Sequence, residues 1–242
     1  MGEVLSSLTG RKALVTGGTR GIGTAIAVRL IADGAEVTVT GTRSDGSAPA
    51  GSRYRPVDFK NESETQAFAD EIAASEFDIL VNNAGINKIA PFTQIDIRDF
   101  DGIQTVNVRA AFLLCRAVLP GMTSRGWGRI VNIASVFGIV SREFRASYSA
   151  SKFALDGLTA ALAAEVASKG VLANCVAPGF IDTELTRSIL DEEGIAELVA
   201  RVPARRLGRP EEVAALVGWL AGPENTFVSG QIIAIDGGFT RV

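Results

Sequence analysis

The fold of this chain is decided by the stretch Lys12-Ala13-Leu14-Val15-Thr16-Gly17-Gly18-Thr19-Arg20-Gly21-Ile22-Gly23. A short apolar run leads directly into closely spaced glycines, and an Ala-, Ile- and Leu-rich segment then continues to about Ala32. This order predicts a buried strand, a tight turn and the first turn of a helix. Free N–H groups and the positive end of a helix dipole suit such a turn to a phosphate group. A plain glycine-rich surface turn is the alternative, and the direct strand-to-helix context favours phosphate binding.

The rest of the chain repeats this alternation of apolar strands and helices. Further strands are expected at about 37–40, 54–57, 78–81, 129–134, 171–177 and 231–235. Further helices are expected at about 62–74, 98–123 and 148–169. Nearly all of the strands are apolar throughout, which is typical of a parallel sheet covered on both faces. The prediction is one α/β domain over residues 1–242, a three-layer doubly wound parallel sheet.

The composition narrows the choice of partners. The 242 residues carry a net charge of −3 and no basic block, which argues against nucleic acid or an anionic membrane as the main partner. No apolar run is expected to be long enough to span a bilayer, and residues 1–10 lack the core of a signal peptide. Cys115 and Cys175 both lie in apolar contexts and are predicted to be reduced thiols of the core. A cytoplasmic protein is therefore expected.

The composition also limits the kinds of catalysis that the chain could perform. The chain contains no histidine, which removes Ser-His-Asp hydrolases and most zinc sites, and no metal site is expected. Acid–base catalysis must then use tyrosine, lysine or carboxylates. Tyr148 and Lys152 lie four residues apart at the start of a predicted helix and share one face of it. A nearby cation stabilises a phenolate and lowers the tyrosine pKa, so the pair could exchange protons with an alcohol or carbonyl. A core-edge aromatic beside a solvated lysine is the ordinary alternative.

The end of the second predicted strand bears on the choice of nucleotide. Many NAD-binding loops place an acidic residue there to hold the ribose 2′-hydroxyl. Here Gly41 occupies that place, Thr42 and Arg43 follow it, and Arg20 lies within the glycine loop. The missing carboxylate and two guanidiniums suit a 2′-phosphate. We predict NADP(H) as the cofactor, with NAD(H) as the alternative and with a plain solvated arginine as the other interpretation of Arg43.

A family resemblance rests on several ordered motifs. They are Thr16-Gly17-x-x-x-Gly21-x-Gly23, Asn82-Asn83-Ala84-Gly85, Asn107, Ser135, Tyr148-x-x-x-Lys152 and Pro178-Gly179. In this order and spacing the chain resembles the classical short-chain dehydrogenases/reductases over essentially its whole length. The resemblance implies a Rossmann fold and hydride transfer between a nicotinamide and a carbonyl or secondary alcohol of a small molecule. It also implies a homotetramer, for which the alanines at 110–111 and 160–164 would allow close helix packing.

The resemblance further assigns roles to matching residues. Tyr148 would be the general acid/base, and Lys152 would lower its pKa and hold the nicotinamide ribose. Ser135 would bind the substrate oxygen, and Asn107 would hold a water in a proton relay, although an asparagine bonded to its own helix backbone is the alternative. Asp58 would receive the adenine amino group. The implied cofactor contacts are Gly17, Thr19, Arg20, Gly21, Ile22, Gly23, Gly41, Thr42, Arg43, Asp58, Phe59, Asn83, Ala84, Gly85, Tyr148, Lys152, Pro178, Gly179, Ile181 and Thr183.

The substrate is less constrained than the cofactor. Residues 180–206 are predicted to form a lid over cofactor and substrate. The runs at 178–186 and 202–212, the second of which ends in Pro210-Glu211-Glu212, are similar to those of 3-oxoacyl-(acyl-carrier-protein) reductases, but sugar, polyol and cyclic-ketone dehydrogenases share the pattern. The loop at 141–145 is bulkier and more charged than expected for those reductases, so Arg142 and Phe144 are candidate substrate contacts, unless they are only surface residues. Phe137 and Phe180 are also candidates.

Two alternatives concern the partner and the function itself. An acyl-carrier protein would need exposed cations near the mouth of the site, for which Lys169, Arg125 and Arg129 are candidates. A non-catalytic, cofactor-sensing protein on the same fold is a remote alternative. The presence of the tyrosine, lysine, serine and asparagine of the catalytic motifs argues against it.

Overall fold

The computed structural model describes residues 8–189 and 191–242. Most of the segment examined for a signal peptide, and Leu190 within the expected lid, therefore lie outside the described residues. Within them, seven parallel strands form one sheet in the order β3-β2-β1-β4-β5-β6-β7. The strands are β1 (Lys12–Val15), β2 (Glu36–Gly41), β3 (Ser52–Pro56), β4 (Ile79–Asn82), β5 (Gly128–Ile133), β6 (Val171–Pro178) and β7 (Ile232–Ile235). The predicted doubly wound parallel sheet is confirmed.

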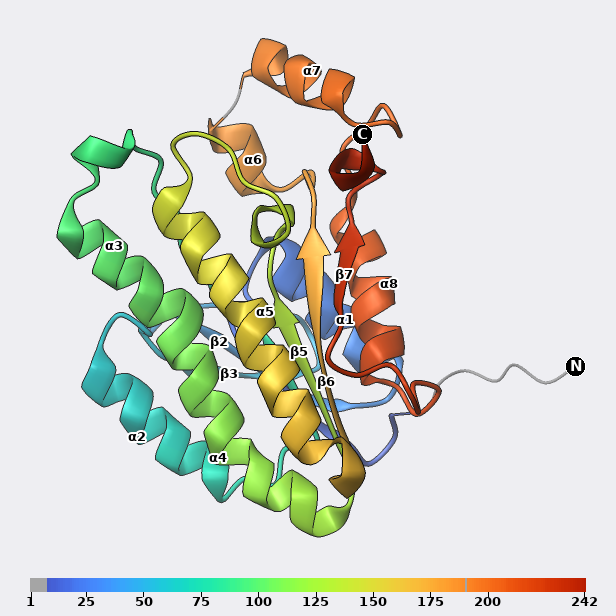
Figure 1. Cartoon of the computed structure of the whole chain (residues 1–242). Helices are drawn as coiled ribbons and strands as arrows, with labels where there is room; N and C mark the ends of the chain where they lie inside the picture. The colour runs from blue at the N-terminus through green and yellow to red at the C-terminus, as the bar shows by residue number, and fades with distance from the viewer. Residues whose placement is uncertain (1–7, 190) are drawn as a thin grey trace, which may run out of the picture.

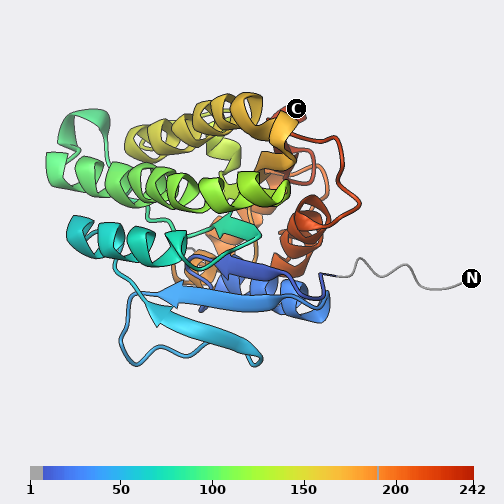
Figure 2. The ribbon, with the colours of Figure 1, turned by 90° about the horizontal axis from the view of Figure 1, so that it is seen from below.

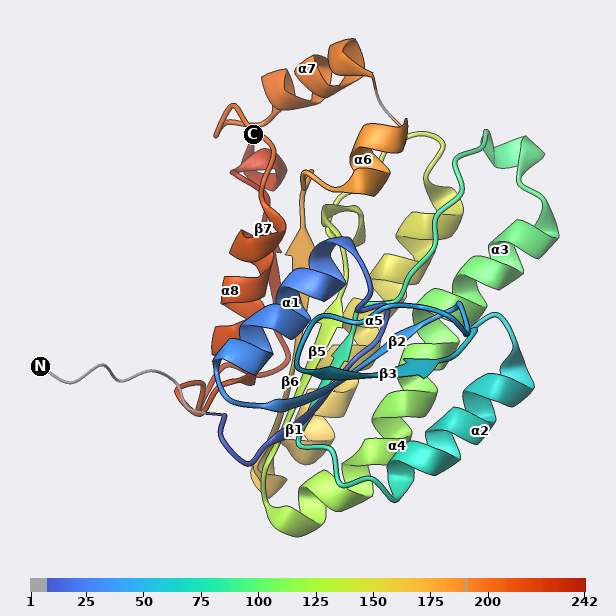
Figure 3. The ribbon, with the colours of Figure 1, turned by 180° about the vertical axis from the view of Figure 1, so that it is seen from behind.

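Helices cover both faces of this sheet (Figures 1 and 3). They are α1 (Gly21–Ala32), α2 (Glu62–Ala73), α3 (Ile97–Gln104), α4 (Ala110–Arg125), α5 (Ala146–Val166), α6 (Glu184–Ile189), α7 (Glu192–Arg201) and α8 (Pro210–Ala221). One face carries α1 and α8, and α2, α4 and α5 cover the other, as the view in Figure 2 also shows. Alternate strand residues point to opposite faces. Leu14 and Leu80 therefore pack in the α2–α4 core, whereas Val15 and Val81 pack in the α1–α8 core.

Helix α8 is an element that the sequence analysis missed. Its start carries recognisable signals, because Pro210 occupies the first turn and the Glu212 side chain accepts a hydrogen bond from the Arg209 backbone N–H at 2.7 Å. These residues were noted only as part of a pattern shared with other reductases. Val213, Val217 and Leu220 of α8 are fully buried against the sheet. The helix therefore completes one of the two outer layers.

The expected helix at 98–123 is a continuous helical run from Ile97 to Arg125, with a π-helical turn at Thr105–Arg109 between α3 and α4. By length and composition this run is apolar enough to cross a membrane, so the expectation that no segment reaches that length is wrong. Half of its apolar window is buried inside the protein, as is typical of a core helix. Its apolar character is therefore accounted for by packing against α2 and β5.

The two cysteines are buried in the core and are not bridged, as predicted. Cys115 is on α4 and Cys175 is on β6, and both are free and buried. The Cys175 sulfur lies 3.1 Å from the Thr159 hydroxyl, and the Cys115 sulfur accepts from the Asn82 side-chain amide at 3.4 Å. Burial raises the thiol pKa of Cys115 to about 12 and that of Cys175 to about 11. Both side chains are therefore neutral thiols at physiological pH.

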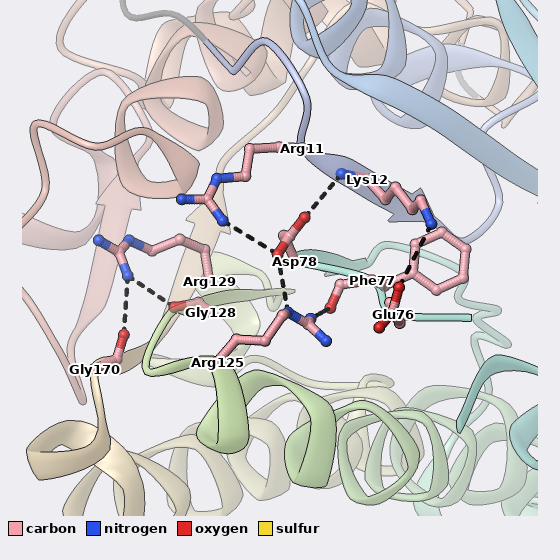
Figure 4. A network of polar contacts seen from close by, with 9 residues as sticks. All are labelled: Arg11, Lys12, Glu76, Phe77, Asp78, Arg125, Gly128, Arg129 and Gly170. Carbon is pink, nitrogen blue, oxygen red and sulfur yellow. Dashed lines mark hydrogen bonds and ion pairs between the residues drawn. The ribbon is translucent and has the colours of Figure 1, made fainter. Parts of the chain in front are cut away.

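The amino-end edge of the sheet carries a buried polar network (Figure 4). Asp78, which is 6% exposed, accepts from Arg11 at 3.3 Å and lies 3.4 Å from the Arg125 guanidinium. Arg129 is also buried and donates to the carbonyls of Gly170 and Asn225 at 3.3 and 2.9 Å. Burial, reinforced by the charge of Arg11, lowers the pKa of Arg129 to about 10.

This network corrects the positions proposed for an acyl-carrier partner. Arg129 lies at the start of β5 and Arg125 at the end of α4, so both are at the amino-end edge of the sheet. Lys169 ends the short 3-10 turn Ala167–Lys169, directly before β6, and so belongs to the same edge. The glycine loop and Ser135 follow the carboxyl ends of their strands. The expectation that these three cations lie near the mouth of the site is therefore wrong.

Candidate active site

The sheet places the predicted site residues at its carboxyl-end edge. Sequence order reverses between β1 and β4, which lie side by side at the centre of the sheet. Ligands of open parallel sheets bind in the crevice at such a reversal. Helices α6 and α7 lie beyond the arrowheads of β6 and β7 at this same edge (Figure 1). The segments around Gly17, Asn83, Ser135 and Gly179 all follow strand ends here.

The glycine loop between β1 and α1 has the geometry of an anion cradle. Gly17 and Gly21 have φ values of +63° and +54°, in the left-handed region that favours glycine. A Cβ atom on Gly23 would lie 2.2 Å from the Gly17 carbonyl oxygen, so any side chain at Gly23 would clash with the backbone of the turn. The first N–H groups of α1 have no acceptor within the helix, and its first turn carries no acidic residue. The loop therefore fits the pyrophosphate of a dinucleotide.

Thr16 and Asn83 hold this loop against the end of β4. The Thr16 hydroxyl oxygen accepts from the backbone N–H groups of Asn83 and Ala84, both at 2.9 Å. In return, the Asn83 side-chain amide donates to the carbonyls of Thr16 and Gly17 at 2.9 and 3.0 Å. A Cβ atom on Gly17 would lie 3.0 Å from the Ala84 Cα. The predicted contacts Asn83 and Ala84 are therefore structural supports of the cradle.

The end of β2 has no room for the carboxylate found in many NAD-binding loops. A Cβ atom on Gly41 would lie 2.8 Å from the Thr19 methyl group and 3.0 Å from the Tyr54 hydroxyl oxygen. Arg43 is exposed beyond it, and two of its nitrogens each donate to Asp45 at 3.0 Å. The Tyr54 hydroxyl donates to the Arg43 carbonyl. A guanidinium is thus available at this end of the sheet, already partly neutralised by Asp45.

Two predicted cofactor contacts in the third strand region differ in character. Asp58 is part-exposed, and its carboxylate accepts from the Lys60 backbone N–H at 3.0 Å. Phe59 is 4% exposed and packs edge-to-face on Phe68, with ring centres 6.3 Å apart. The Phe59 side chain is therefore a core residue, and only its backbone could face a nucleotide.

The structure brings Tyr148, Lys152 and Ser135 together. Tyr148 lies in the first turn of α5, and Lys152 lies one turn later with its Nζ atom 5.6 Å from the centre of the Tyr148 ring. Lys152 is 3% exposed, and Nζ donates to the Ile133 carbonyl at 2.7 Å. Ser135 caps the 3-10 turn Val136–Gly138 by accepting from the Phe137 backbone N–H at 3.2 Å, and it hydrogen-bonds Tyr148.

Asn107 lies within the π-helical turn between α3 and α4. Its side-chain oxygen accepts from the Ile86 N–H at 2.8 Å, and its amide donates to the Ile86 carbonyl and the Ser151 hydroxyl, both at 3.0 Å. Ser151 in turn donates to the Tyr148 carbonyl at 2.7 Å. Asn107 therefore bonds another loop and α5, not its own helix backbone. A Cβ atom on Gly85 would lie 3.4 Å from the Asn107 side-chain oxygen and 3.6 Å from Lys152 Nζ, so these two residues face the same point.

The pKa shifts of the pair are set by burial. Burial lowers the pKa of Lys152 to about 8. Burial raises the pKa of Tyr148, while the hydrogen bond with Ser135 and the charge of Arg145 act in the lowering direction. The pKa of Tyr148 is therefore raised overall, whereas the nearby Lys152 was expected to lower it. The physical reason is that both members of the pair lose solvation, which disfavours the phenolate and the ammonium alike.

The four candidate substrate residues fall into two groups. Phe137 and Phe180 lie edge-to-face at 6.3 Å, and Phe239 packs on Phe180 at 5.0 Å, which makes an aromatic wall. Arg142 and Phe144 instead line a hollow of about 350 Å³ together with residues of the 90–92 segment. Neither Tyr148 nor Ser135 lines this hollow. Phe144 itself has a φ of +65°, which strains a residue with a side chain.

The first residues of the expected lid still contact the core and the glycine loop. Ile181 is 5% exposed and bridges in parallel to Gly208, so its side chain belongs to the core. A Cβ atom on Gly21 would lie 3.6 Å from the Thr183 methyl group, which places Thr183 beside the glycine loop. Gly179 is pressed against Asp236, because a Cβ atom on it would lie 2.8 Å from the Asp236 Cα. The residues after Pro178 are thus held directly over the cradle.

Sequence reasoning missed several residues of this region. Thr16 was quoted within the glycine motif, but its role in holding Asn83 was not seen. Ser151, inside the Tyr148–Lys152 motif, and Arg145, three residues before Tyr148, were also left without a role. Their positions next to recognised motifs were the available signal. Phe239 carried no local signal, because its contact with Phe180 arises only when β7 pairs with β6.

Comparisons with known proteins agree with this geometry. A family model described as enoyl-(acyl carrier protein) reductase matches residues 17–240. Nodulation protein G of Rhizobium sp. (strain N33) is 41% identical, over 97% of this chain and 99% of its own. A 3-oxoacyl-(acyl-carrier-protein) reductase of Vibrio cholerae serotype O1 is also 41% identical, over 98% of this chain and 100% of its own.

A solved structure is similarly close. The gluconate 5-dehydrogenase of Burkholderia cenocepacia J2315, in complex with NADP and tartrate, superposes with a TM-score of 0.91 at 34% identity, covering 98% of this chain and 99% of that one. These similarities extend over essentially the whole chain. With the glycine cradle and the Tyr148–Lys152–Ser135 arrangement, they establish that the chain is an NAD(P)-dependent oxidoreductase and belongs to the short-chain dehydrogenase/reductase family.

Proposed function

We propose that this protein is an NADP(H)-dependent oxidoreductase that interconverts a ketone and a secondary alcohol, with Tyr148 as the general acid/base. The observation that carries the proposal is the convergence of Tyr148, Ser135 and Lys152 beside the glycine cradle. A nicotinamide would supply the hydride. The protein's own groups then have to bind the substrate oxygen, provide a proton and hold the dinucleotide.

Each role follows from a position in the site. Ser135 would donate to the substrate oxygen, and the Tyr148 hydroxyl would transfer its proton to the same oxygen during reduction. Lys152, fixed by the Ile133 carbonyl, would hold the ribose hydroxyls and stabilise the phenolate that remains. Asn107 would support a water-mediated return of the proton, because it faces Lys152 across Gly85. A raised Tyr148 pKa favours the protonated acid that the reductive direction needs.

The choice of NADP(H) over NAD(H) rests on the end of β2. Gly41 leaves no space for a carboxylate toward the 2′ position, and Arg43 and Arg20 are both exposed near the cradle. In this proposal Arg43 exchanges part of its pairing with Asp45 for the 2′-phosphate. Because the Arg43–Asp45 pair is fully exposed, it is a weak competitor.

Two substrate classes fit the proposal. The reductase of V. cholerae favours a 3-oxoacyl thioester, with an acyl-carrier protein as partner. The B. cenocepacia dehydrogenase favours a sugar acid, the alternative in which the enzyme oxidises an alcohol. The charged loop at 141–145 is the observation that favours the second class, because it brings the guanidinium of Arg145 to 5.4 Å from the centre of the Phe137 ring in the aromatic wall.

We also propose a homotetramer built on the exposed face of α5 and on α4. Phe153 is 45% exposed, and Gly157, Ala160 and Ala164 are exposed at three- and four-residue spacing along the same helix. Phe112 on α4 is 49% exposed. Large apolar side chains beside small residues allow two such helices to approach closely. Ala110 and Ala111 are buried within the protein and belong to its own core, not to this face.

The first prediction concerns Tyr148. Tyr148→Phe removes the proton donor and keeps the ring, so turnover should fall by at least about a thousandfold while NADPH binding stays within about threefold. NADPH oxidation with acetoacetyl thioester, sugar-acid and cyclic-ketone substrates measures the rate, and NADPH fluorescence measures the binding. A variant that retains more than a few per cent of the rate would show that Tyr148 is not the acid.

The second prediction concerns the buried ammonium of Lys152. Its pKa is lowered to about 8 in the fold, so the unfolded chain takes up more protons above that pH, and stability should rise as the pH increases toward 10.5. Relative to Lys152→Met, the free energy of unfolding of the wild type should gain roughly 2 kcal/mol between pH 7.5 and 9.5. Urea denaturation at each pH measures it. Lys60→Met, at an exposed lysine, is the control and should show no such gain.

The third prediction concerns the nucleotide. Arg43→Leu should lower kcat/KM for NADPH by roughly 10- to 100-fold and leave that for NADH nearly unchanged, because a charge-assisted bond to the 2′-phosphate is lost. Steady-state kinetics with both nucleotides test this. Arg53→Leu, at a similarly exposed arginine near the start of β3, should leave both values unchanged. Equal or better efficiency of the wild type with NADH would contradict the proposal.

The fourth prediction concerns assembly. The wild type should elute from gel filtration with light-scattering detection at about four times the mass of the 25.4 kDa chain. Phe153→Glu should dissociate it, because a charge would then lie within the apolar contact. Phe227→Glu, at a phenylalanine that is 96% exposed but lies outside α4 and α5, is the matched control. A monomeric wild type would refute the proposed interface.

A further inference from the structure

Arg145 lies between the catalytic tyrosine and the aromatic wall. It immediately precedes α5 and is half-buried. Its guanidinium carbon lies 5.4 Å from the centre of the Phe137 ring, and Phe137 follows Ser135 by two residues. Burial raises the pKa of the Tyr148 phenol, and the charge of Arg145 opposes part of that rise. The guanidinium is therefore placed at the aromatic wall and near the Tyr148 phenol.

This cation has no counter-charge in the part of the chain that the structure describes. Other arginines of the protein, such as Arg43, Arg98 and Arg187, each pair with a carboxylate within about one turn of chain. No carboxylate pairs with Arg145 among residues 8–189 and 191–242. Its strongest electrostatic neighbour is another cation, Arg142, which together with burial lowers the pKa of Arg145.

Removing a guanidinium from water without an anion is unfavourable, and a second guanidinium nearby adds to that cost. A bound anion would offset both. A guanidinium presents a planar fork of N–H donors that matches a carboxylate, which is the geometry of the strongest charge-assisted pairs. The Phe137 ring lies against one side of the fork.

We infer that Arg145 binds a carboxylate of the substrate and thereby selects keto acids and hydroxy acids over neutral ketones. The inference rests on the oxidoreductase function proposed above for the same site. Arg145 would orient the substrate so that its carbonyl or hydroxyl carbon lies against Ser135 and Tyr148. An acidic protein surface would contact Arg142 instead, because Arg142 is exposed and Arg145 is half-buried.

The test separates binding from turnover. Binding of tartrate, a hydroxy dicarboxylate, and of its neutral dimethyl ester is measured by calorimetry on the full chain loaded with NADP⁺. Wild-type protein should bind tartrate at least 10-fold more tightly than the ester. Arg145→Gln should weaken tartrate binding by roughly 10- to 100-fold and leave the ester unchanged, because one charge-assisted bidentate pair is lost. Arg145→Lys should recover part of the loss, and Arg53→Gln, an exposed control, should match the wild type.

Turnover provides the second measurement. The same variants are assayed with a keto acid, its methyl ester, and an acetoacetyl group carried either on N-acetylcysteamine or on acyl-carrier protein. The loss in Arg145→Gln should appear in KM for the keto acid only. Equal losses for acid and ester, or tartrate binding that ignores the substitution, would overturn the inference. A loss confined to the acyl-carrier protein substrate would also overturn it and would assign Arg145 to a protein partner.

These experiments distinguish failure of the Arg145 inference from failure of the proposed oxidoreductase function. If no ketone or alcohol is turned over with either nucleotide, the oxidoreductase proposal fails, while the tartrate measurement still decides whether Arg145 binds a carboxylate. If turnover is observed and is lost in Tyr148→Phe, the oxidoreductase proposal stands whatever Arg145 does.

Discussion

The reciprocal hydrogen bonds between Thr16 and Asn83 are the constraint on which the site depends. They join the ends of β1 and β4, the two strands between which the chain order reverses, and they fix the glycine loop against the sheet. Without this join the cradle would be a mobile turn, since Gly17 and Gly21 adopt conformations that cost flexible residues entropy to hold. The same edge then receives Ser135 from β5 and the start of α5. The side chains of Thr16 and Asn83 thus fix the glycine loop at the same sheet edge as the residues proposed for proton transfer.

Much of this arrangement could be predicted from the sequence because it is local. The glycine spacing, the strand before it and the helix after it lie within a dozen residues, and Tyr148 and Lys152 lie one helical turn apart. The carboxyl-end rule for parallel sheets then places Ser135 and Asn83 at the same edge without any structure. Helix α8 was missed although its start signals at Pro210 are also local, because that run was interpreted only as a pattern shared with related reductases.

The remaining features depend on contacts between distant segments. Phe239 reaches Phe180 only through the pairing of β7 with β6, and no periodicity in either segment predicts that. Arg129 was expected on an exposed surface because arginine usually is, yet it lies in the interior and donates to the carbonyls of Gly170 and Asn225. The direction of the Tyr148 pKa shift could not be predicted either. It reflects a balance between desolvation and neighbouring charges, and burial is a property of the whole fold.

Because Cys115 and Cys175 are buried, their chemical modification would report on opening of the fold. The thiolate is the species that alkylating reagents attack, and both thiols are buried with pKa values far above neutral. Reagent can therefore modify Cys115 only when α4 separates from the sheet, and Cys175 only when β6 becomes accessible. The native chain therefore carries two internal probes of opening, one on the covering helix α4 and one on strand β6. Their relative rates of modification would show whether the layers of this protein open one at a time or together.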